Sequence, residues 1–220
     1  MPLPTLGRNS GLIRKAQDCV ILLGPENAAL ITTITTGASS ALIDFATAHS
    51  SYISLGRHTK EDGLNWSRDI NAEDVTSHGV SEPTRRDMTS DVLSLQVQLQ
   101  ETKKRTMELA FGVDLTPVTP TATTGEIAFI KPAAPSTIFY RLIALASDGA
   151  GTSTYYYARL LARVSVSSID AQVWSETSEL RTPVTFTAHL DDAAGFAVKE
   201  FWGGPGWKAN LVAMGFPAAT

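Results

Sequence analysis

The chain has 220 residues, of which 43% are hydrophobic and 18% are charged, and its formal net charge at pH 7 is −4. This composition is typical of a folded domain, and the acidic balance argues against a protein that holds nucleic acid by neutralising phosphates. No apolar run approaches the roughly 18 residues needed to span a bilayer, so we expect no membrane segment. The single cysteine, Cys19, allows no internal disulfide and no zinc cage, which fits assembly in a reducing cytoplasm.

The first third of the chain predicts an extended arm followed by short strands. Prolines and glycines between residues 1 and 17 disfavour a helix, so this segment is expected to be an N-terminal arm. Residues 18–220 are expected to form a single β domain. Apolar and β-branched residues predict strands at 18–23, 28–35 and 52–58, whereas 37–50 fits either a short helix or a loop.

The most regular pattern lies in two arms, 63–70 and 90–101, in which apolar and polar residues alternate. Alternation with a period of two predicts half-buried antiparallel strands. The expected core face of this hairpin consists of Trp66, Leu93, Leu95, Val97 and Leu99.

Between the two arms, residues 71–90 are almost entirely polar and read as a long hairpin loop. Loops of more than roughly 12–15 residues are uncommon in compact domains and are usually functional or disordered. A loop of mixed charge is suited to contact with another protein, for which arginine and carboxylate side chains are the natural partners. The candidate contact residues are Glu73, Asp74, Glu82, Arg85, Arg86 and Asp87.

A helix and a second series of strands complete the predicted fold. Thr102 is a plausible N-cap and Gly112 a plausible stop for a helix whose buried side would carry Met107, Ala110 and Phe111. Strands are expected at 126–130, 138–146, 153–166, 169–175 and 183–190, before a C-terminal segment at 197–220. Nearly continuous apolar sequence at 138–146 predicts a strand covered on both faces. Residues 156 to 166 are expected to place every second side chain on one face. The fold class is therefore mainly β: two packed antiparallel sheets, as a sandwich or partial barrel, with a flanking helix.

No pattern of catalytic or metal-binding residues stands out. The four histidines lack the helical spacing of a zinc pair, and no Gly-x-Ser-x-Gly motif marks a nucleophile. The glycines around Pro205 lack the lysine of a phosphate-binding loop and read as a turn. Trp202 and Trp207 are more simply hydrophobic anchors of the C-terminal segment than a platform for a sugar. We expect no enzyme activity, no cofactor and no metal.

Several motifs together resemble one family. They are WSRD at 66–69, SEPTRRDMTSDV at 81–92, QETKKRTMELAFGVDL at 100–115 and EFWGGPGW at 200–207. In this order they are similar to the major tail tube proteins of long-tailed, siphovirus-type actinobacterial phages. The resemblance covers roughly residues 53–115 and 180–208.

The resemblance implies a structural virion protein with two packed β sheets and a flanking helix. Six subunits would form a ring, and stacked rings would form the tail tube that conducts genomic DNA without binding it specifically. It also implies assembly in the host cytoplasm and contacts with the tape measure, terminator and distal tail proteins. The 71–90 loop would reach an adjacent ring. The alternative is a carbohydrate-binding β-sandwich module of a virion adhesin or capsid decoration protein, with Tyr155, Tyr157 and Trp202 clustered beside carboxylates.

Overall fold

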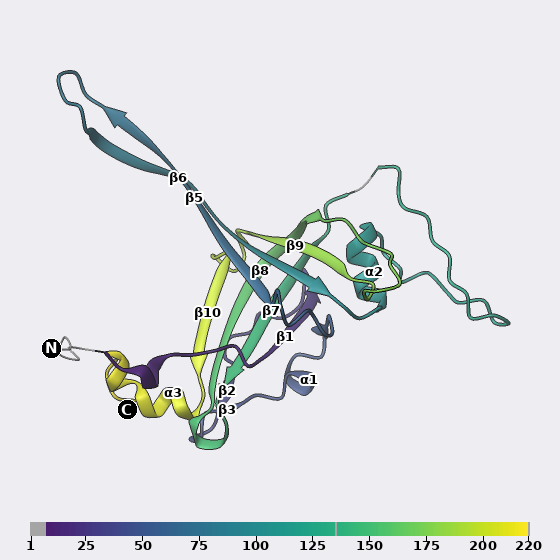
Figure 1. Cartoon of the computed structure of the whole chain (residues 1–220), viewed down its shortest axis with the longest axis horizontal. Coiled ribbons are helices and arrows are strands. Elements are labelled where there is room, and N and C mark those ends of the chain that lie inside the picture. Colours follow the sequence, from purple (N-terminus) through teal and green to yellow (C-terminus); the bar gives the residue numbers. More distant parts are fainter. Residues whose placement is uncertain (1–7, 135, 220) are drawn as a thin grey trace.

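One curled antiparallel sheet builds most of the molecule, as the computed structural model shows for residues 8–134 and 136–219 (Figure 1). Its strands follow the order β4-β1-β7-β8-β9-β6-β5, and β10 also pairs with β8, which makes eight strands; β2 and β3 form a separate pair. The strands are β1 (Asp18–Pro25), β2 (Thr35–Thr36), β3 (Ala41–Leu42), β4 (Ile53–Ser54), β5 (Leu64–Thr76), β6 (Pro83–Leu99), β7 (Phe139–Asp148), β8 (Tyr155–Ile169), β9 (Thr182–His189) and β10 (Val198–Gly203). The helices are α1 (Phe45–Ala48), α2 (Lys104–Phe111) and α3 (Pro205–Asn210), and short 3-10 turns lie at Ser10–Leu12, Gly151–Ser153 and Val212–Met214.

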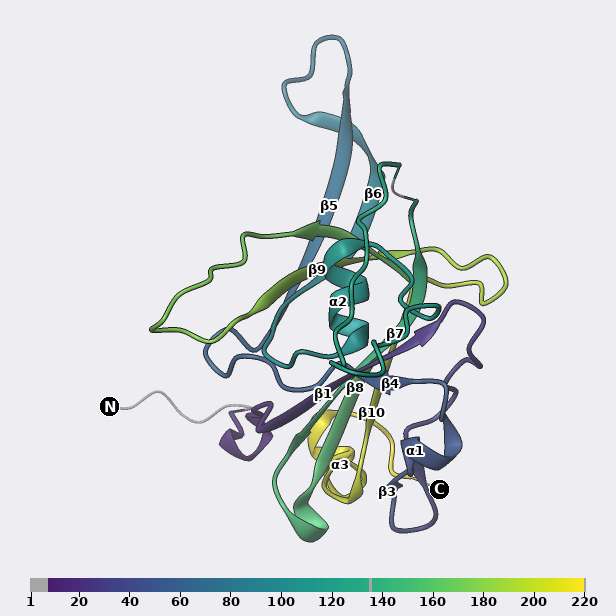
Figure 2. The same ribbon diagram turned by 90° about the vertical axis from the view of Figure 1, so that its right-hand side faces the viewer.

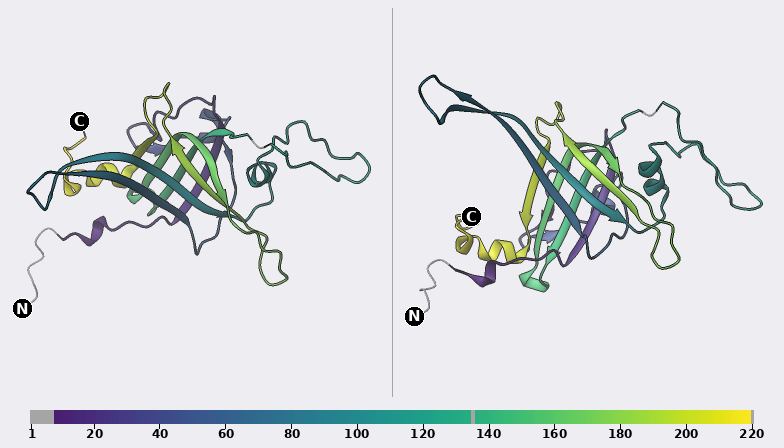
Figure 3. Two further views of the ribbon diagram at one scale, coloured as in Figure 1. Left: turned by 90° about the horizontal axis from the view of Figure 1, so that it is seen from above. Right: turned by 45° about the horizontal axis from the view of Figure 1, so that its top comes forward.

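The sheet folds over itself because β8 pairs with different strands along its length. Its first half, from Tyr156 to Leu161, pairs with β10, and its second half, from Arg163 to Ile169, pairs with β9. Strands β9, β6 and β5 therefore lie across β1, β7 and β8 (Figure 3). The mainly β fold class is confirmed, and its two layers belong to one continuous sheet.

Two hydrophobic cores lie on opposite faces of β1, β7 and β8. The main core fills the space between the layers and is capped by Leu109 of α2; its other large members include Ile21, Leu23, Leu55, Leu95, Val97, Leu99, Leu142, Leu161, Val164, Val184 and Phe186. The second core lies under the segment between β1 and β4 and comprises Leu22, Ala28, Ile31, Ile34, Tyr52, Ile143, Leu145, Ala158 and Leu160. Strand β7 supplies side chains to both cores, so its near-continuous apolar sequence is explained.

The expectation that alternate residues from 156 to 166 lie on one face of the sheet is wrong, because β8 contains a β-bulge. Tyr156, Ala158 and Leu160 pack in or against the second core, whereas Val164 and Val166 pack in or against the main core. The register with β7 shifts by one residue between these two groups. A bulge places an extra residue on one strand, and alternate side chains beyond it change face.

Four expected strands are absent or shortened, and of the predicted 52–58 only Ile53–Ser54 form a strand. Residues 28–34 are not in a strand and only Thr35–Thr36 pair, while 126–130 have no strand assignment and β8 ends at Ile169 before the predicted 169–175. A segment with strand-forming residues becomes a strand only where the backbone edge of another strand is free to pair with it. The undecided segment 37–50 contains β3 and the one-turn helix α1, which Asp44 caps through the Ala46 N–H.

Helix α2 ends as predicted at Gly112, which adopts a left-handed conformation with φ of 60°. Its start and its buried side differ from the prediction: Lys103, not Thr102, is the N-cap, and the buried residues are Thr106, Glu108 and Leu109. The helix is rotated so that Phe111 is exposed and Leu109 meets the main core, where the helix lies against β9 (Figure 2). The Glu108 carboxylate is satisfied by the Leu115 N–H and by Arg105.

A buried ion pair joins the loops at one end of the sheet. Arg141 of β7 donates to the carbonyls of Ala28 and Ala162 and lies 2.9 Å from the Asp191 carboxylate. Asp191 also accepts from the N–H groups of Ala193 and Ala194, which together with Arg141 lower its pKa. The pair therefore ties the turn after β1 to the turn between β9 and β10.

The hairpin face of β6 gives the first test of the fold. Leu95 has no exposed surface in the main core, so Leu95→Asp would bury a carboxylate without a partner. We expect a loss of several kcal/mol against a total stability of about 5–15 kcal/mol, and hence insoluble protein. Gln96→Ser is the matched control, since Gln96 points the other way and bonds only to Asp170 at 3.0 Å. A soluble Leu95→Asp protein with an unchanged melting temperature would show that this face is not buried.

Candidate assembly surface

The segment expected to be a long loop is instead a β ribbon. Strands β5 and β6 remain paired from Leu64↔Val97 as far as Thr76↔Pro83, so the connecting loop is only residues 77–82. Figures 1 and 3 show this ribbon projecting well beyond the body of the sheet. Polar composition misled the prediction because both faces of the projecting part are solvated, whereas strand pairing depends on backbone hydrogen bonds.

The base of the ribbon is attached to the body by packing, and an ion pair joins its two strands. Leu64 and Trp66 pack against the main core, and the Arg159 guanidinium lies 4.5 Å from the Trp66 ring centroid. Across the ribbon, Arg68 makes a two-pronged hydrogen bond to Asp91, which lowers the pKa of that carboxyl. The ribbon therefore leaves the body at a defined position.

The six candidate contact residues all lie on the exposed ribbon. Arg86 is paired with Asp74 across the two strands, with 3.7 Å between Nε and Oδ1. Arg85 bonds to Asp87 of its own strand at 2.9 Å, and Glu73 faces Asp87 in the ladder. Glu82 lies in the loop at the tip. Within this chain each arginine has a carboxylate partner, and pairing with carboxylates of a neighbouring subunit stays a prediction.

Four exposed apolar side chains on the ribbon were not among the predicted site residues. They are Ile70, Val75, Val80 and Met88, each between 46% and 63% exposed. The signal was present in the sequence, because these are the large apolar residues between residues 70 and 90. Ile70 and Met88 lie on one face of the ribbon and Val75 on the other, so apolar side chains lie among charged ones on both faces.

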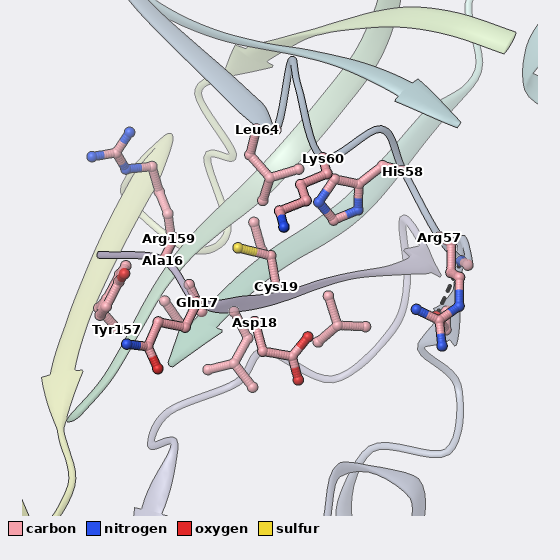
Figure 4. Close-up of a pocket in the computed structure, with 18 of the residues that line it drawn as sticks. Ala16, Gln17, Asp18, Cys19, Arg57, His58, Lys60, Leu64, Tyr157 and Arg159 are labelled. Atoms are coloured by element: carbon pink, nitrogen blue, oxygen red, sulfur yellow. Dashed lines mark hydrogen bonds between the residues drawn. The ribbon is translucent and has the colours of Figure 1, made fainter. Parts of the chain in front are cut away.

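An open groove of about 950 Å³ lies beside the ribbon's base, on the main-core side of the sheet. Figure 4 shows Cys19 on its floor, with Leu64, Lys60 and His58 on one side and Tyr157 and Arg159 on the other. At one end, Glu101 accepts the Arg57 N–H at 2.7 Å and pairs with Lys103 at 2.7 Å, and these contacts lower its pKa.

The cysteine in the groove is not activated as a nucleophile. Burial, helped by the nearby Asp18, raises the pKa of the Cys19 thiol, whereas a reactive cysteine needs a lowered one. Burial lowers the pKa of His58, and its Nδ1 has no hydrogen-bond partner in the structure. In the described part of the chain, no cluster of three His, Cys, Asp or Glu residues could hold a metal ion.

The aromatic residues of the C-terminal segment contact one another in a row. Trp202 is stacked against Tyr157 and against Trp207, with ring centroids 5.3 Å and 5.4 Å apart, and Trp207 also contacts Phe216. Tyr155 is buried and lies under Arg14. Trp202 is stacked with two aromatic neighbours of its own chain, although it stays 48% exposed. This arrangement favours the interpretation of Trp202 and Trp207 as anchors of the tail.

The fold and its surface define a β protein with a projecting ribbon. For the residues described, none of the helices combines the length and apolar character that a membrane crossing requires.

Comparison with known proteins gives the family. A family model described as phage tail tube protein matches residues 6–198, so the chain belongs to the phage tail tube protein family. It is a structural component of the phage tail tube and of the virion. No curated protein matches the chain. A crystal structure of an Hcp protein is similar at 10% identity, over 83% of this chain and 97% of that one, with a TM-score of 0.32.

Proposed function

We propose that this protein assembles into hexameric rings that stack into the tail tube of a siphovirus-type actinobacterial phage and conduct its genomic DNA into the host. The family membership supports the tube, and the resemblance of the motifs supplies the ring of six and the phage type. The observation that carries the proposal is the ribbon, which projects from the body and exposes apolar side chains within a charged rim.

The ribbon is suited to contact between rings. It reaches beyond the body in the direction of the β5 and β6 strands, as stacking of one ring on another requires (Figure 1). Its exposed ion pairs can exchange partners at little cost, because such pairs contribute only about 0–1 kcal/mol. Ile70 and Met88, which share one face of the ribbon, would provide apolar surface for this contact.

Ring closure would use the unpaired sheet edges. Among the described residues, the outer edges of β5 and β10 have no strand partner. Exposed edges invite pairing with another chain, and a closed ring removes that hazard. Assembly would take place in the host cytoplasm, with the tape measure, terminator and distal tail proteins as further partners.

The acidic balance suits a conduit. With a formal net charge of −4 per subunit, the assembled tube has no excess of positive charge with which to hold DNA through counterion release. Screening over about 8 Å at physiological salt keeps the repulsion short-ranged. Genomic DNA would then pass through the lumen without specific binding.

Removing the ribbon tests its role in stacking. Ile70 and Asp91 face each other in the ladder, so an Asn-Gly turn in place of residues 71–90 joins two paired positions. The removed residues belong to neither core, and we expect a monomer that melts close to the wild-type temperature but forms no tubes in negative-stain images. Tubes of normal length from this variant would contradict the ring-to-ring role.

Charge reversal gives a finer test of the same surface. Because both arginines are 72% exposed, replacing Arg85 and Arg86 with glutamate should change the free energy of unfolding by less than about 1 kcal/mol. Tube growth, followed by light scattering, should fall strongly through repulsion between rings. Exchanging the pair as Asp74→Arg with Arg86→Asp is the control, since it keeps the charge of the ribbon. Equal growth of the reversed and exchanged variants would exclude a role for these arginines in stacking.

DNA binding tests the conduit. At about 0.15 M salt, assembled tubes should bind duplex DNA more weakly than the roughly 10⁻⁴–10⁻⁶ M of ordinary non-specific binders. The measurement is fluorescence anisotropy of a labelled duplex titrated with tubes. Tight binding, or cleavage of the duplex, would overturn the passive role.

A further inference from the structure

The segment between α2 and β7 carries a strand pattern without a strand. Residues 126–131, EIAFIK, have the composition of a strand, yet they belong to no sheet. A turn closed by hydrogen bonds between Thr121 and Glu126 forms the tip of this excursion. From residue 127 to residue 134, no backbone group makes a hydrogen bond within the described part of the chain.

The same segment exposes apolar side chains. Ile130 is 89% exposed and Ile127 41% exposed, whereas Phe129 is fixed by an edge contact with Phe111 of α2 at 5.3 Å. One side of the segment is therefore held by its own helix, and Ile130 faces away from it. Backbone N–H and C=O groups without partners, next to exposed apolar side chains, favour pairing with the edge of another sheet.

The sheet offers an edge of matching length. Strand β10 has six residues, pairs with β8 on one side, and has no strand partner on the other among the described residues. Strand β4 has only two residues, and β5 continues into the polar ribbon. Beside the free edge of β10, Trp202 is 48% exposed, so an added strand would cover apolar surface there.

The two features lie on opposite sides of the molecule. Figure 1 shows the excursion after α2 extending to the right and β10 at the left of the sheet. The segment therefore cannot pair with β10 of its own chain. Complementary patches on opposite sides produce head-to-tail contacts, which close into a ring when the rotation between subunits allows it.

We propose that residues 126–131 of one copy add as a strand to the outer edge of β10 in a second copy, within the ring. This rests on the proposed function and names the contact that joins neighbouring subunits. Main-chain hydrogen bonds would supply the affinity of such an added strand, and its alternate side chains would supply the specificity. Ile130 or its neighbours would then lie alongside Trp202.

Hydrogen exchange measured by mass spectrometry tests the contact directly. In the unassembled chain, the amides of residues 127–131 should exchange almost as fast as in a free peptide. In assembled tubes, they and the outward amides of β10 should exchange at least ten times more slowly. Tubes in which residues 127–131 exchange as fast as in the unassembled chain would overturn the inference and leave the proposed function intact. A protein that forms no tubes would remove both.

Proline substitutions test the same hydrogen bonds. Consecutive N–H groups of a strand point to opposite sides, so one of Ile127→Pro and Ala128→Pro must remove a donor to the neighbouring edge. Both variants should melt like the wild type, because neither amide has a hydrogen-bond partner among the residues that the structure describes. One of them should lower the yield of tubes more than tenfold. Thr123→Pro, in the turn at the tip, is the control and should assemble normally. Normal assembly by both test variants would overturn the inference.

Discussion

The division of one edge of β8 between two partner strands is the constraint on which the rest of the structure depends. One strand has two edges, and β8 uses one edge for β7 and divides the other between β10 and β9. The bulge near the division moves the side chains of β8 from the second core to the main core. The sheet can therefore curl over the main core while the other face of β7 and β8 stays covered by the segment before β4.

The same geometry separates a stable body from its projections. Both cores and the Arg141–Asp191 pair lie in the body, whereas the ribbon and the excursion after α2 extend beyond it (Figures 1 and 3). Elements that bury little surface within their own chain contribute little to its folding. The ribbon and the excursion can therefore contact other subunits. Such contacts would bury the exposed side chains of Ile70, Met88 and Ile130.

The chemistry of the surface agrees with a structural role. The groove beside the ribbon holds a thiol whose pKa is raised by burial, so it is not activated as a nucleophile. The aromatic stack at the C-terminus packs on itself. Charged residues on the ribbon are paired with each other, which keeps a protruding element soluble until a partner arrives.

The sequence by itself determined the class of the fold, the strand at β6, the doubly covered strand at β7 and the end of α2 at Gly112. These follow from local rules, since the alternation of side chains and the left-handed tolerance of glycine are properties of a few adjacent residues. The sequence also indicated that the 71–90 segment is a contact surface, although it predicted a loop there. Only the tertiary structure decided that this segment is a paired ribbon, that β8 changes face at a bulge, and that 126–130 remains without a partner. Strand pairing joins residues that are distant in sequence, so whether a strand-forming segment finds an edge depends on where the other strands already lie.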